Sequence, residues 1–492
     1  MTSPRDTSPR APSETEPSDT VPGDTVPSDT VPSDTDAYDL AVIGAGPAGT
    51  AAALRAAELG AKVVVLEASD RLGGTCVNTG CVPTRVLAKT ARLMREVGAA
   101  RDYGVVTHPE ALDWPATVAR VHERVDRVRA VKNEAERFGA AGIDLVQEGR
   151  ARFADAHTLR LDSGRRIRAA SVIVAVGGHS RRLPLPGAEL ATVPEHVLEL
   201  PSLPPRVAII GAGNTGAQLA TVFESFGSTV SLLDVAPRVL MASDADVSAA
   251  IAASFEGHGM TVRTGIAGVD ALQKDGTGIV LRWREQDGPA EDRFDAVVMA
   301  TGWPADVEDL GLEHAGVRIE RSSIPVDAYF RSEVSHILAV GDAIGRDMLV
   351  QAAQFEGEAA AENAVLGVNR RTPHHLLPAG GFTDPDYAGV GLTEEQARQR
   401  DARCIVAVAN YADLERAVID DRAVGFLKLI TDNRRELILG AHAVGENAVE
   451  VIQSVTTAMA AGIDVATLAG VKFAYPTYSA IIGLAARQLL RA

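Results

Sequence analysis

The stretch YDLAVIGAGPAGTAAALRAAELGAKVVVLE, residues 38–67, decides the fold of this chain. Residues 40–43 and 63–66 are short apolar runs typical of buried strands, and residues 51–59 form an alanine-rich run typical of a helix. Between the first strand and the helix, Gly44, Gly46 and Gly49 have the G-x-G-x-x-G spacing, and Glu67 ends the second strand. This strand-turn-helix-strand pattern predicts a dinucleotide-binding site.

A second copy of the pattern, RVAIIGAGNTGAQLATVFESFGSTVSLLD, occupies residues 206–234. Its turn contains Gly211, Gly213 and Gly216, and Asp234 ends its second strand. In both copies the acid follows the first glycine by the same interval, from 44 to 67 and from 211 to 234. One glycine motif is weak evidence, but two with matching strands and acids are strong evidence. The sequence therefore predicts two dinucleotide sites.

The acids at the ends of the two motifs bear on which dinucleotides bind. Glu67 and Asp234 are each expected to accept hydrogen bonds from a ribose. Because Asp234 would repel a 2'-phosphate, the second site is predicted to prefer NADH over NADPH, although Arg238 lies near enough to weaken that distinction. Two such sites in one chain suggest a flavin that is reduced by a nicotinamide.

Two of the three cysteines lie in the loop GGTCVNTGCVPTR, residues 73–85. The loop leads into a helical run at residues 86–97, so Cys76 and Cys81 are expected at a helix N-terminus beside the first dinucleotide, where a thiolate is stabilised. The pair could exchange electrons with the flavin, bind a metal, or be a coincidence. Two cysteines without further ligands nearby do not make a structural zinc site, so no metal site is expected. Cys404 is predicted to be a core thiol.

The composition of the chain argues against some classes of binding partner. A net charge of -17 argues against nucleic acid and anionic membranes, and the longest uncharged apolar stretch, residues 40–54, is too short to span a bilayer. The polar N-terminus lacks the apolar core of a signal peptide, which favours a reducing cytoplasm. Residues 18–36 run SDTVPGDTVPSDTVPSDTD, and residues 1 to about 36 are predicted to be a disordered tail.

Several motifs together resemble the class I pyridine nucleotide-disulfide oxidoreductases, the group of dihydrolipoamide dehydrogenase, glutathione reductase and mercuric reductase. They are GAGPAG (44–49), GGTCVNTGC (73–81), GAGNTG (211–216), ATGWPADVEDLGL (300–312), ILAVGDAIG (337–345) and FTDPDYAGVGLTEEQA (382–397). The resemblance implies an α/β fold with two Rossmann-like domains, for FAD and NAD(P), and a C-terminal α+β dimerisation domain that makes a homodimer. The expected segments are 1–36 (tail), 37–184 and 298–369 (FAD), 185–297 (NAD(P)) and 370–492 (dimerisation).

The resemblance also implies roles for single residues. Cys81 is expected to lie against the flavin as the charge-transfer thiol, and Cys76 to be the exchange thiol that faces the substrate. Asp342 is expected to contact the ribityl and pyrophosphate region of FAD. The other cofactor-binding residues expected from these motifs are Gly74, Thr75, Arg85, Gly302 and Gly341.

The chain departs from the group at the C-terminus. Where the disulfide reductases carry His-Pro-Thr-x-x-Glu, residues 475–480 read YPTYSA, with Tyr475 in place of the histidine acid-base and Ala480 in place of the glutamate. By resemblance Tyr475 would act across the dimer, in the partner's site. The usual lysine-glutamate pair beside the flavin is replaced by Arg85 and Gln218. Mercuric reductase also works without that histidine, but its C-terminal cysteine pair has no counterpart after Cys404.

Three hypotheses follow. In the first, electrons pass from NAD(P)H through FAD and the Cys76-Cys81 pair to an acceptor that needs no histidine, such as Hg(II), a quinone or an unusual disulfide. In the second, the chain is a quinone reductase or diaphorase with idle cysteines, or an ordinary disulfide reductase like dihydrolipoamide dehydrogenase. In the third, it is a flavin-stabilised dimer without significant turnover.

Overall fold

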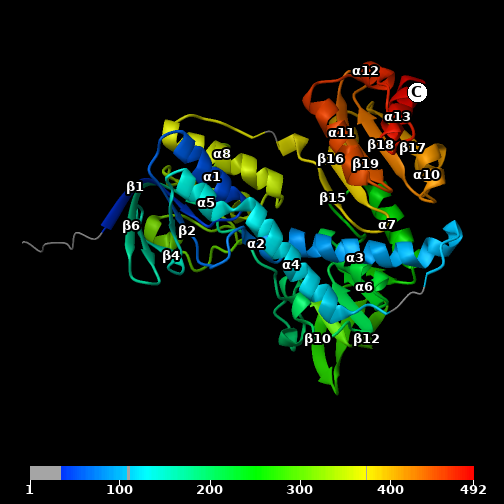
Figure 1. Ribbon diagram of the computed structural model, residues 1–492, viewed down its shortest axis with the longest axis horizontal. Coiled ribbons are helices and arrows are strands. Elements are labelled where there is room, and N and C mark those ends of the chain that lie inside the picture. The colour runs from blue at the N-terminus through cyan, green and yellow to red at the C-terminus, as the bar shows by residue number, and fades with distance from the viewer. Residues whose placement is uncertain (1–34, 108–110, 373, 492) are drawn as a thin grey trace, which may run out of the picture.

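The computed structural model describes residues 35–107, 111–372 and 374–491, arranged around four β-sheets (Figure 1). The predicted tail at residues 1–34 lies outside the described residues. Asp36, which was assigned to that tail, instead belongs to the first strand, where it forms an ion pair with Arg165. The order of helices and strands confirms the predicted α/β class.

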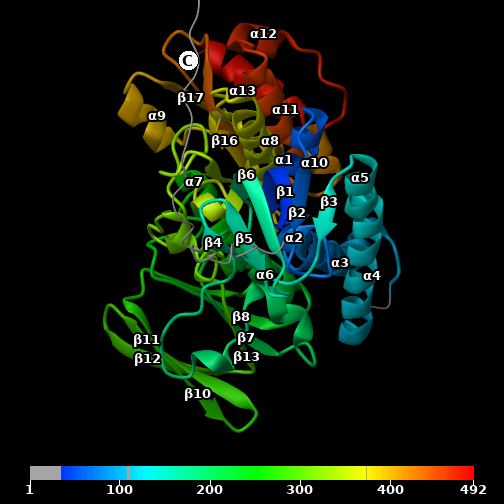
Figure 2. The same cartoon turned by 90° about the vertical axis from the view of Figure 1, so that its left-hand side faces the viewer.

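The first sheet is built from two distant parts of the chain. Its strands, in spatial order, are β3 (Asp144–Val146), β2 (Val63–Leu66), β1 (Thr35–Ile43) and β6 (Arg166–Val174), followed by β5 (Thr158–Leu161) and β4 (Ala151–Asp155), with β14 (Ile337–Ala339) also paired to β6. Strands β3, β2, β1, β6 and β14 are parallel. Helices α1 (Pro47–Glu58) and α8 (Val350–Leu366) lie side by side on one face (Figure 2). Strand β14 and helix α8, which complete this part of the structure, therefore come about 300 residues after its first strand.

The second sheet repeats the motif of the first. Its parallel strands are β13 (Ala296–Met299), β7 (Arg206–Ile210), β8 (Thr229–Asp234) and β9 (Thr261–Thr264), with helices α6 (Asn214–Ser225) and α7 (Ala245–Gly257). Beside it lies an antiparallel sheet of β10 (Gly268–Asp275), β11 (Gly278–Glu285) and β12 (Gly288–Phe294). All four residues of β13 pair with β7, so the predicted border after residue 297 divides a strand, and we move it to follow Met299.

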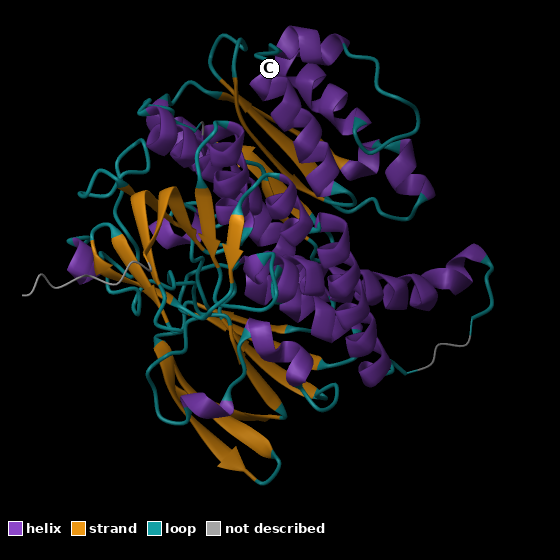
Figure 3. Cartoon of the chain, turned by 60° about the vertical axis from the view of Figure 1, so that its left-hand side comes forward, coloured by secondary structure: helices purple, strands orange, loops and turns teal. Residues whose placement is uncertain are grey.

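The C-terminal part is an antiparallel sheet with helices packed on it (Figure 3). Its strands, in spatial order, are β15 (Ala379–Gly381), β16 (Tyr387–Gly391), β19 (Ile438–Val444), β18 (Phe426–Thr431) and β17 (Ile405–Asn410). Its helices are α9 (Glu394–Arg400), α10 (Glu415–Ile419), α11 (Ala448–Ala460), α12 (Val465–Gly470) and α13 (Ala480–Arg491). Cys404 is buried against α9 and β18, as predicted.

A helical segment contacts both the second sheet's helix α6 and the C-terminal part. It consists of α2 (Gly74–Asn78), α3 (Cys81–Ala99), α4 (Trp114–Lys132) and α5 (Glu134–Ala140). Helix α3 packs against α4 and α6, and its arginines reach the C-terminal part, where Arg92 pairs with Glu446 and the Arg95 Nε lies 2.7 Å from Asp384. Short 3₁₀ turns are η1 (Ala100–Tyr103), η2 (Ala188–Leu190), η3 (Pro194–Glu199), η4 (Leu312–Ala315), η5 (Gly341–Ile344), η6 (His374–Leu376) and η7 (Tyr411–Asp413).

A buried ion cluster also ties the second sheet to the C-terminal part. The Lys428 ammonium lies 2.8 Å from Asp244, 2.6 Å from Asp246 and 2.8 Å from Glu394. Both Lys428 and Asp244 are only 2% exposed. Because an unpaired buried charge is strongly destabilising, the three carboxylates are required to keep the lysine charged in this position.

Candidate active site

The first glycine loop brings the backbone of β1 and α1 close to its neighbours. Gly44 has a φ of 102°, and a β-carbon there would lie 2.5 Å from the Ala175 carbonyl oxygen. A β-carbon on Gly49 would lie 1.9 Å from the Gly44 oxygen. For Gly46, the nearest atom to such a carbon is the Gly74 α-carbon at 3.8 Å. Two glycines therefore allow close packing, and the third leaves bare backbone at the start of α1.

The N-terminus of α1 is suited to an anion. Its N-cap is Gly46, no side chain caps it, and its first turn contains no acid. Glu67 accepts hydrogen bonds from the backbone N–H groups of Ala45 (2.8 Å) and Ser69 (2.9 Å), so it fixes the loop. The amide groups of the first turn therefore have no side-chain cap and remain available to an anion such as a phosphate.

The second glycine loop has the same construction. Gly211 has a φ of 106°, and a β-carbon there would lie 2.2 Å from the Ala300 oxygen. A β-carbon on Gly216 would lie 1.8 Å from the Gly211 oxygen, whereas one on Gly213 would meet nothing within 4 Å. Asp234 accepts from the backbone N–H groups of Ala212 (2.6 Å) and Ala236 (2.8 Å). The two glycine loops thus share the same close backbone approaches at their first and third glycines, and in both the acid accepts hydrogen bonds from the backbone of its loop.

Arg238 is held away from a position where it could serve as a free phosphate ligand. Its guanidinium donates to the carbonyl oxygens of Met241 and Ser243, both at 3.0 Å, and to the Ser248 hydroxyl. These bonds occupy the arginine within its own loop.

The two cysteines of the predicted pair lie together. Cys81 is the first residue of α3, as expected of a helix N-terminus, while Cys76 lies within the short helix α2. Both are free thiols; Cys81 is exposed and Cys76 is partly buried. A hydrogen bond from the Cys76 thiol to the Cys81 sulfur lowers the pKa of Cys81 to about 7, and the same bond, together with burial, raises the pKa of Cys76. Cys81 is therefore the sulfur that ionises first.

Asp342 lies beside the glycine loop and the cysteines. It follows Gly341, whose φ is 64° and whose added β-carbon would lie 3.2 Å from the Ala48 side chain of α1. Burial raises the pKa of the Asp342 carboxyl, and a hydrogen bond from the Trp303 indole opposes that rise. Asp342 is close enough to both cysteines to act against their ionisation.

The loop between the glycine motif and the cysteines is tightly folded. Gly74 has a φ of 62°, and a β-carbon there would lie 2.8 Å from the Gly46 α-carbon. The Thr75 carbonyl accepts from the backbone N–H groups of Thr79 (3.0 Å) and Gly80 (2.7 Å), which closes the turn between the two cysteines. The predicted residues Gly74, Thr75 and Cys76 are thus brought against the N-terminus of α1.

Among the described residues, no hydrogen bond joins the substituted pair Arg85 and Gln218. The Arg85 guanidinium lies 4.6 Å from the centre of the Phe382 ring, and the Gln218 amide donates to the Asn214 carbonyl oxygen at 2.8 Å. Among the described residues Arg85 has no carboxylate within ion-pair distance. Gly302, with a φ of 125°, turns the chain just before Trp303.

Tyr475 is separate from the cysteines of its own chain. It lies between α12 and α13, it is 76% exposed, and its hydroxyl forms no hydrogen bond with a described residue. Tyr478 is 6% exposed and donates to Asp420 at 2.9 Å, so it is a packing residue.

Sequence reasoning missed two residues near Asp342. One is Trp303, and the other is Glu356, a 1% exposed side chain on α8 that accepts from the Gly341 backbone N–H at 2.8 Å. Burial raises the pKa of Glu356 to about 7. Trp303 lies inside a quoted motif, but no spacing rule links it to a residue 39 positions later.

Within residues 35–107, 111–372 and 374–491, no helix has both the length and the apolar character that a bilayer crossing needs. The same residues contain no group of three or more His, Cys, Asp or Glu side chains arranged to hold a metal ion.

Comparison with known proteins agrees with this geometry. The family Pyridine nucleotide-disulphide oxidoreductase matches residues 38–357, and its dimerisation domain matches residues 377–486. The dihydrolipoyl dehydrogenase of Zymomonas mobilis is 32% identical over 453 residues, 89% of this chain and 95% of that protein. The chloroplastic/mitochondrial glutathione reductase of Pisum sativum is 33% identical over 452 residues, 89% of this chain and 80% of that protein.

A solved structure is also similar. The Cu(II) complex of the HOCl-induced flavoprotein disulfide reductase RclA from Escherichia coli has a TM-score of 0.82 and 26% identity, covering 92% of this chain and all of that one. The chain belongs to the pyridine nucleotide-disulphide oxidoreductases, FAD enzymes that use NAD(P)H.

The residues present fit FAD. The bare backbone of Gly46 facing Gly74, the uncapped N-terminus of α1 and the partly buried carboxyl of Asp342 lie together beside the cysteines. These features suit the pyrophosphate and the ribityl chain of FAD, and they would place the cofactor beside the dithiol.

Proposed function

We propose that this enzyme passes electrons from NADH through FAD and the Cys76-Cys81 pair to a thiol-binding metal ion. The observation that carries the proposal is the dithiol: one cysteine with a pKa of about 7 accepts a hydrogen bond from the other, while a tyrosine replaces the histidine acid-base. When bound, FAD would carry the two electrons of a hydride from the nicotinamide to the Cys76-Cys81 disulfide.

The balance of protons favours a metal acceptor. Reducing a disulfide consumes two electrons and two protons, so a disulfide reductase needs a group that donates protons near neutral pH. Reducing two Cu(II) to Cu(I), or one Hg(II) to Hg(0), consumes two electrons and no protons, and the dithiol releases its two protons to water as its disulfide forms. A tyrosine in place of the histidine is a poor acid-base at neutral pH. A metal acceptor needs no proton donor, and coordination to the metal displaces the thiol protons to water.

Each sulfur has a task in this scheme. Cys81 ionises first because the Cys76 thiol donates to it, which supplies the thiolate next to the flavin. Cys76 becomes the stronger nucleophile once its proton leaves, because its pKa is the higher of the two. We assign Cys76 to metal binding and exchange. The Cu(II) complex of the similar RclA supports metal ions as the first acceptors to try.

We also propose that NADH is the electron donor in preference to NADPH. Asp234 places a carboxylate at the end of β8, where a 2'-phosphate would meet a like charge. Arg238, the one nearby residue that had weakened this prediction, donates to Met241, Ser243 and Ser248. It would have to break these bonds to bind a phosphate.

A homodimer would complete the site. The match to the family's dimerisation domain supports this arrangement, and the 76% exposed Tyr475 lies within it. We propose that Tyr475 projects into the partner's cysteine site and contacts the metal-thiolate there.

An acceptor panel tests the proposal. NADH oxidation is measured anaerobically with Hg(II), Cu(II), a quinone, lipoamide and glutathione disulfide, for wild type, Cys76→Ser, Cys81→Ser and the control Cys404→Ser. Metal reduction should fall at least 100-fold in the first two variants and stay unchanged in the control. If Cys81→Ser reduces metals at the wild-type rate, the cysteines are idle and the enzyme is a diaphorase instead.

A further inference from the structure

Trp303 contacts the carboxyl group that faces the FAD site, and nothing in the motifs assigns it a role. Its indole Nε1–H donates to the Asp342 Oδ2 at 2.8 Å. We propose that Trp303 is a positioning residue for FAD: it holds the Asp342 carboxylate so that the other oxygen is presented to the cofactor. The inference rests on the FAD site of the proposed function but not on the identity of the acceptor.

The backbone around Trp303 is fixed by the segment beside it. Residues 177–181 and 302–306 run antiparallel, with hydrogen bonds from His179 N–H to Pro304 O (3.0 Å), from Arg181 N–H to Gly302 O (3.0 Å) and from Asp306 N–H to Gly177 O (3.0 Å). Trp303 therefore projects from a short ladder rather than from a free loop.

Gly178 provides the space that the indole occupies. A β-carbon at Gly178 would lie 2.5 Å from the Trp303 Nε1 and 2.6 Å from the Pro304 carbonyl oxygen. Contacts below about 3 Å force one of the two groups to move. The absence of a side chain at Gly178 is thus a condition for the observed position of the indole next to Asp342.

Asp342 is held from two directions. Its loop is fixed through Gly341, whose N–H donates to the buried Glu356, and its own carboxyl is fixed by the indole. An indole N–H can only donate, so it binds the carboxylate and not a second donor. The Asp342 Oδ1 accepts no hydrogen bond from a described residue. One oxygen is therefore fixed, and the other remains for the hydroxyl groups of a cofactor.

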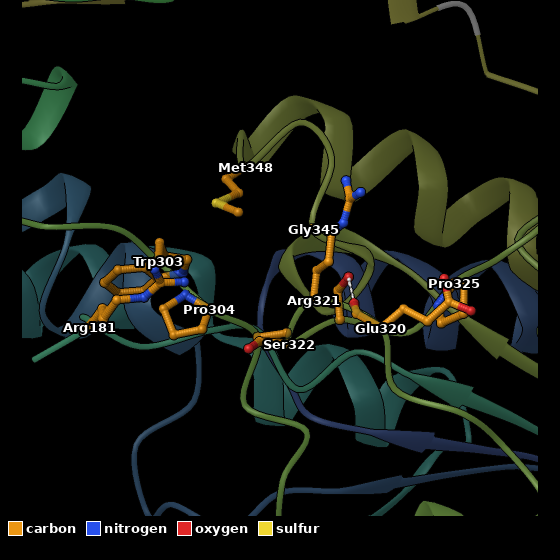
Figure 4. Close-up of a pocket in the computed structure, with 11 residues that line it drawn as sticks. Arg181, Trp303, Pro304, Glu320, Arg321, Ser322, Pro325, Gly345 and Met348 are labelled. Carbon is orange, nitrogen blue, oxygen red and sulfur yellow. Dashed lines mark hydrogen bonds between the residues drawn. The ribbon is translucent and has the colours of Figure 1, made fainter. Parts of the chain in front are cut away.

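The indole also lines a cavity next to its own ladder. Trp303 lines a cavity of about 660 Å³ together with Arg181, Pro304, Ser322 and Met348 (Figure 4). The hydrogen bond between Trp303 and Asp342 is partly buried, where it is stronger than in water.

The test compares Trp303→Phe with Trp283→Phe. Trp283 is a matched control, because its indole also donates to a carboxylate, that of Glu285 at 3.0 Å, but from strand β11 rather than from the segment beside Asp342. FAD is removed from the full-length protein, and its dissociation constant on rebinding is measured by flavin fluorescence. NAD⁺ affinity and the thermal midpoint of the apoprotein are measured alongside.

Trp303→Phe should weaken FAD binding by roughly tenfold or more, as expected for a lost hydrogen bond to a charged group, while NAD⁺ affinity and the thermal midpoint stay near wild type. Trp283→Phe should leave FAD affinity unchanged. Gly178→Ala, which pushes the indole off Asp342, is the second variant and should weaken FAD binding as well.

Wild-type FAD affinity in both Trp303→Phe and Gly178→Ala would overturn the inference and leave the proposed function standing. Equal losses of FAD affinity in Trp303→Phe and Trp283→Phe would overturn it too, since the effect would then be general destabilisation. A wild-type protein that binds no FAD would instead contradict the proposed function itself.

Discussion

Gly213→Ala and Gly216→Ala add one methyl group to the same glycine loop, but the two variants should fail in different ways. A β-carbon on Gly216 would lie 1.8 Å from the Gly211 carbonyl oxygen, which belongs to the backbone and cannot rotate away. A β-carbon on Gly213 would meet nothing within 4 Å. We therefore expect the space at Gly213 to be needed by the dinucleotide, whereas the space at Gly216 is needed by the fold.

The magnitudes follow from these contacts. Overpacking against backbone at Gly216 should lower the free energy of unfolding by about 3 kcal/mol or more. The better helix propensity of alanine recovers about 1 kcal/mol, because Gly216 lies inside α6. At the N-cap, Gly213→Ala should lower stability by less than about 1 kcal/mol. It should weaken dinucleotide binding at least tenfold, roughly 1.4 kcal/mol, because the methyl group takes the place of a phosphate oxygen.

NAD⁺ affinity is measured by calorimetry and stability by the thermal midpoint, for both variants and for wild type. We expect Gly213→Ala to keep the midpoint and lose NAD⁺ affinity, and Gly216→Ala to lower the midpoint by several degrees. Wild-type NAD⁺ affinity in a folded Gly213→Ala protein would refute the reasoning about the second glycine. A Gly216→Ala protein as stable as wild type would refute the packing argument.

Three further predictions test the cysteines, the missing histidine and the ion cluster. Cys76→Ala removes the hydrogen-bond donor that lowers the pKa of Cys81 to about 7. The pH midpoint for alkylation of Cys81 by iodoacetamide should therefore move upward, toward the ordinary thiol value of 9.0. An unchanged pH profile would show that Cys76 is not the cause. Tyr475→His should raise the rate of lipoamide reduction at least tenfold at pH 7, because a histidine donates protons near neutrality, and should leave metal reduction within about twofold of wild type. Both rates are measured as steady-state NADH oxidation with each acceptor. An equal gain with lipoamide and with the metal would contradict the proton argument. Lys428→Met leaves Asp244 buried without its partner and should lower the free energy of unfolding by about 3 kcal/mol or more at pH 7. Because the pKa of Asp244 is lowered in the fold, its contribution in wild type is present above the ordinary carboxyl pKa and is lost as the pH falls, so the difference in thermal midpoint between Lys428→Met and wild type should shrink in acid.

The sequence predicted the parts of the fold that depend on local patterns. Residues 40–43 and 63–66 pair as parallel strands because each is a continuous apolar run that can be buried on both faces. The first helix begins at Pro47 rather than at residue 51, because a proline fits the first turn of a helix and the small residues after it tolerate the close approach of β1. Cys81 begins α3, as its position before the helical run predicted.

The parts that escaped prediction depend on contacts between distant residues. Strand β14 joins β6 across more than 150 positions, and β13 returns to β7 across almost 90, which is why the border after residue 297 was misplaced. At the site, the spacing identified Glu67 and Asp234 but not that each would also hold the backbone of its own loop. Trp303 reaches Asp342 only through the ladder formed with residues 177–181.

The most direct test of the central claim, that Cys76 and Cys81 exchange electrons with FAD, is an anaerobic titration of the purified protein with NADH while its visible spectrum is recorded. A long-wavelength charge-transfer band should appear after two electrons in the wild type and in Cys404→Ser, and it should be missing in Cys81→Ser. Simple bleaching of the flavin in the wild type, without that band, would contradict the claim.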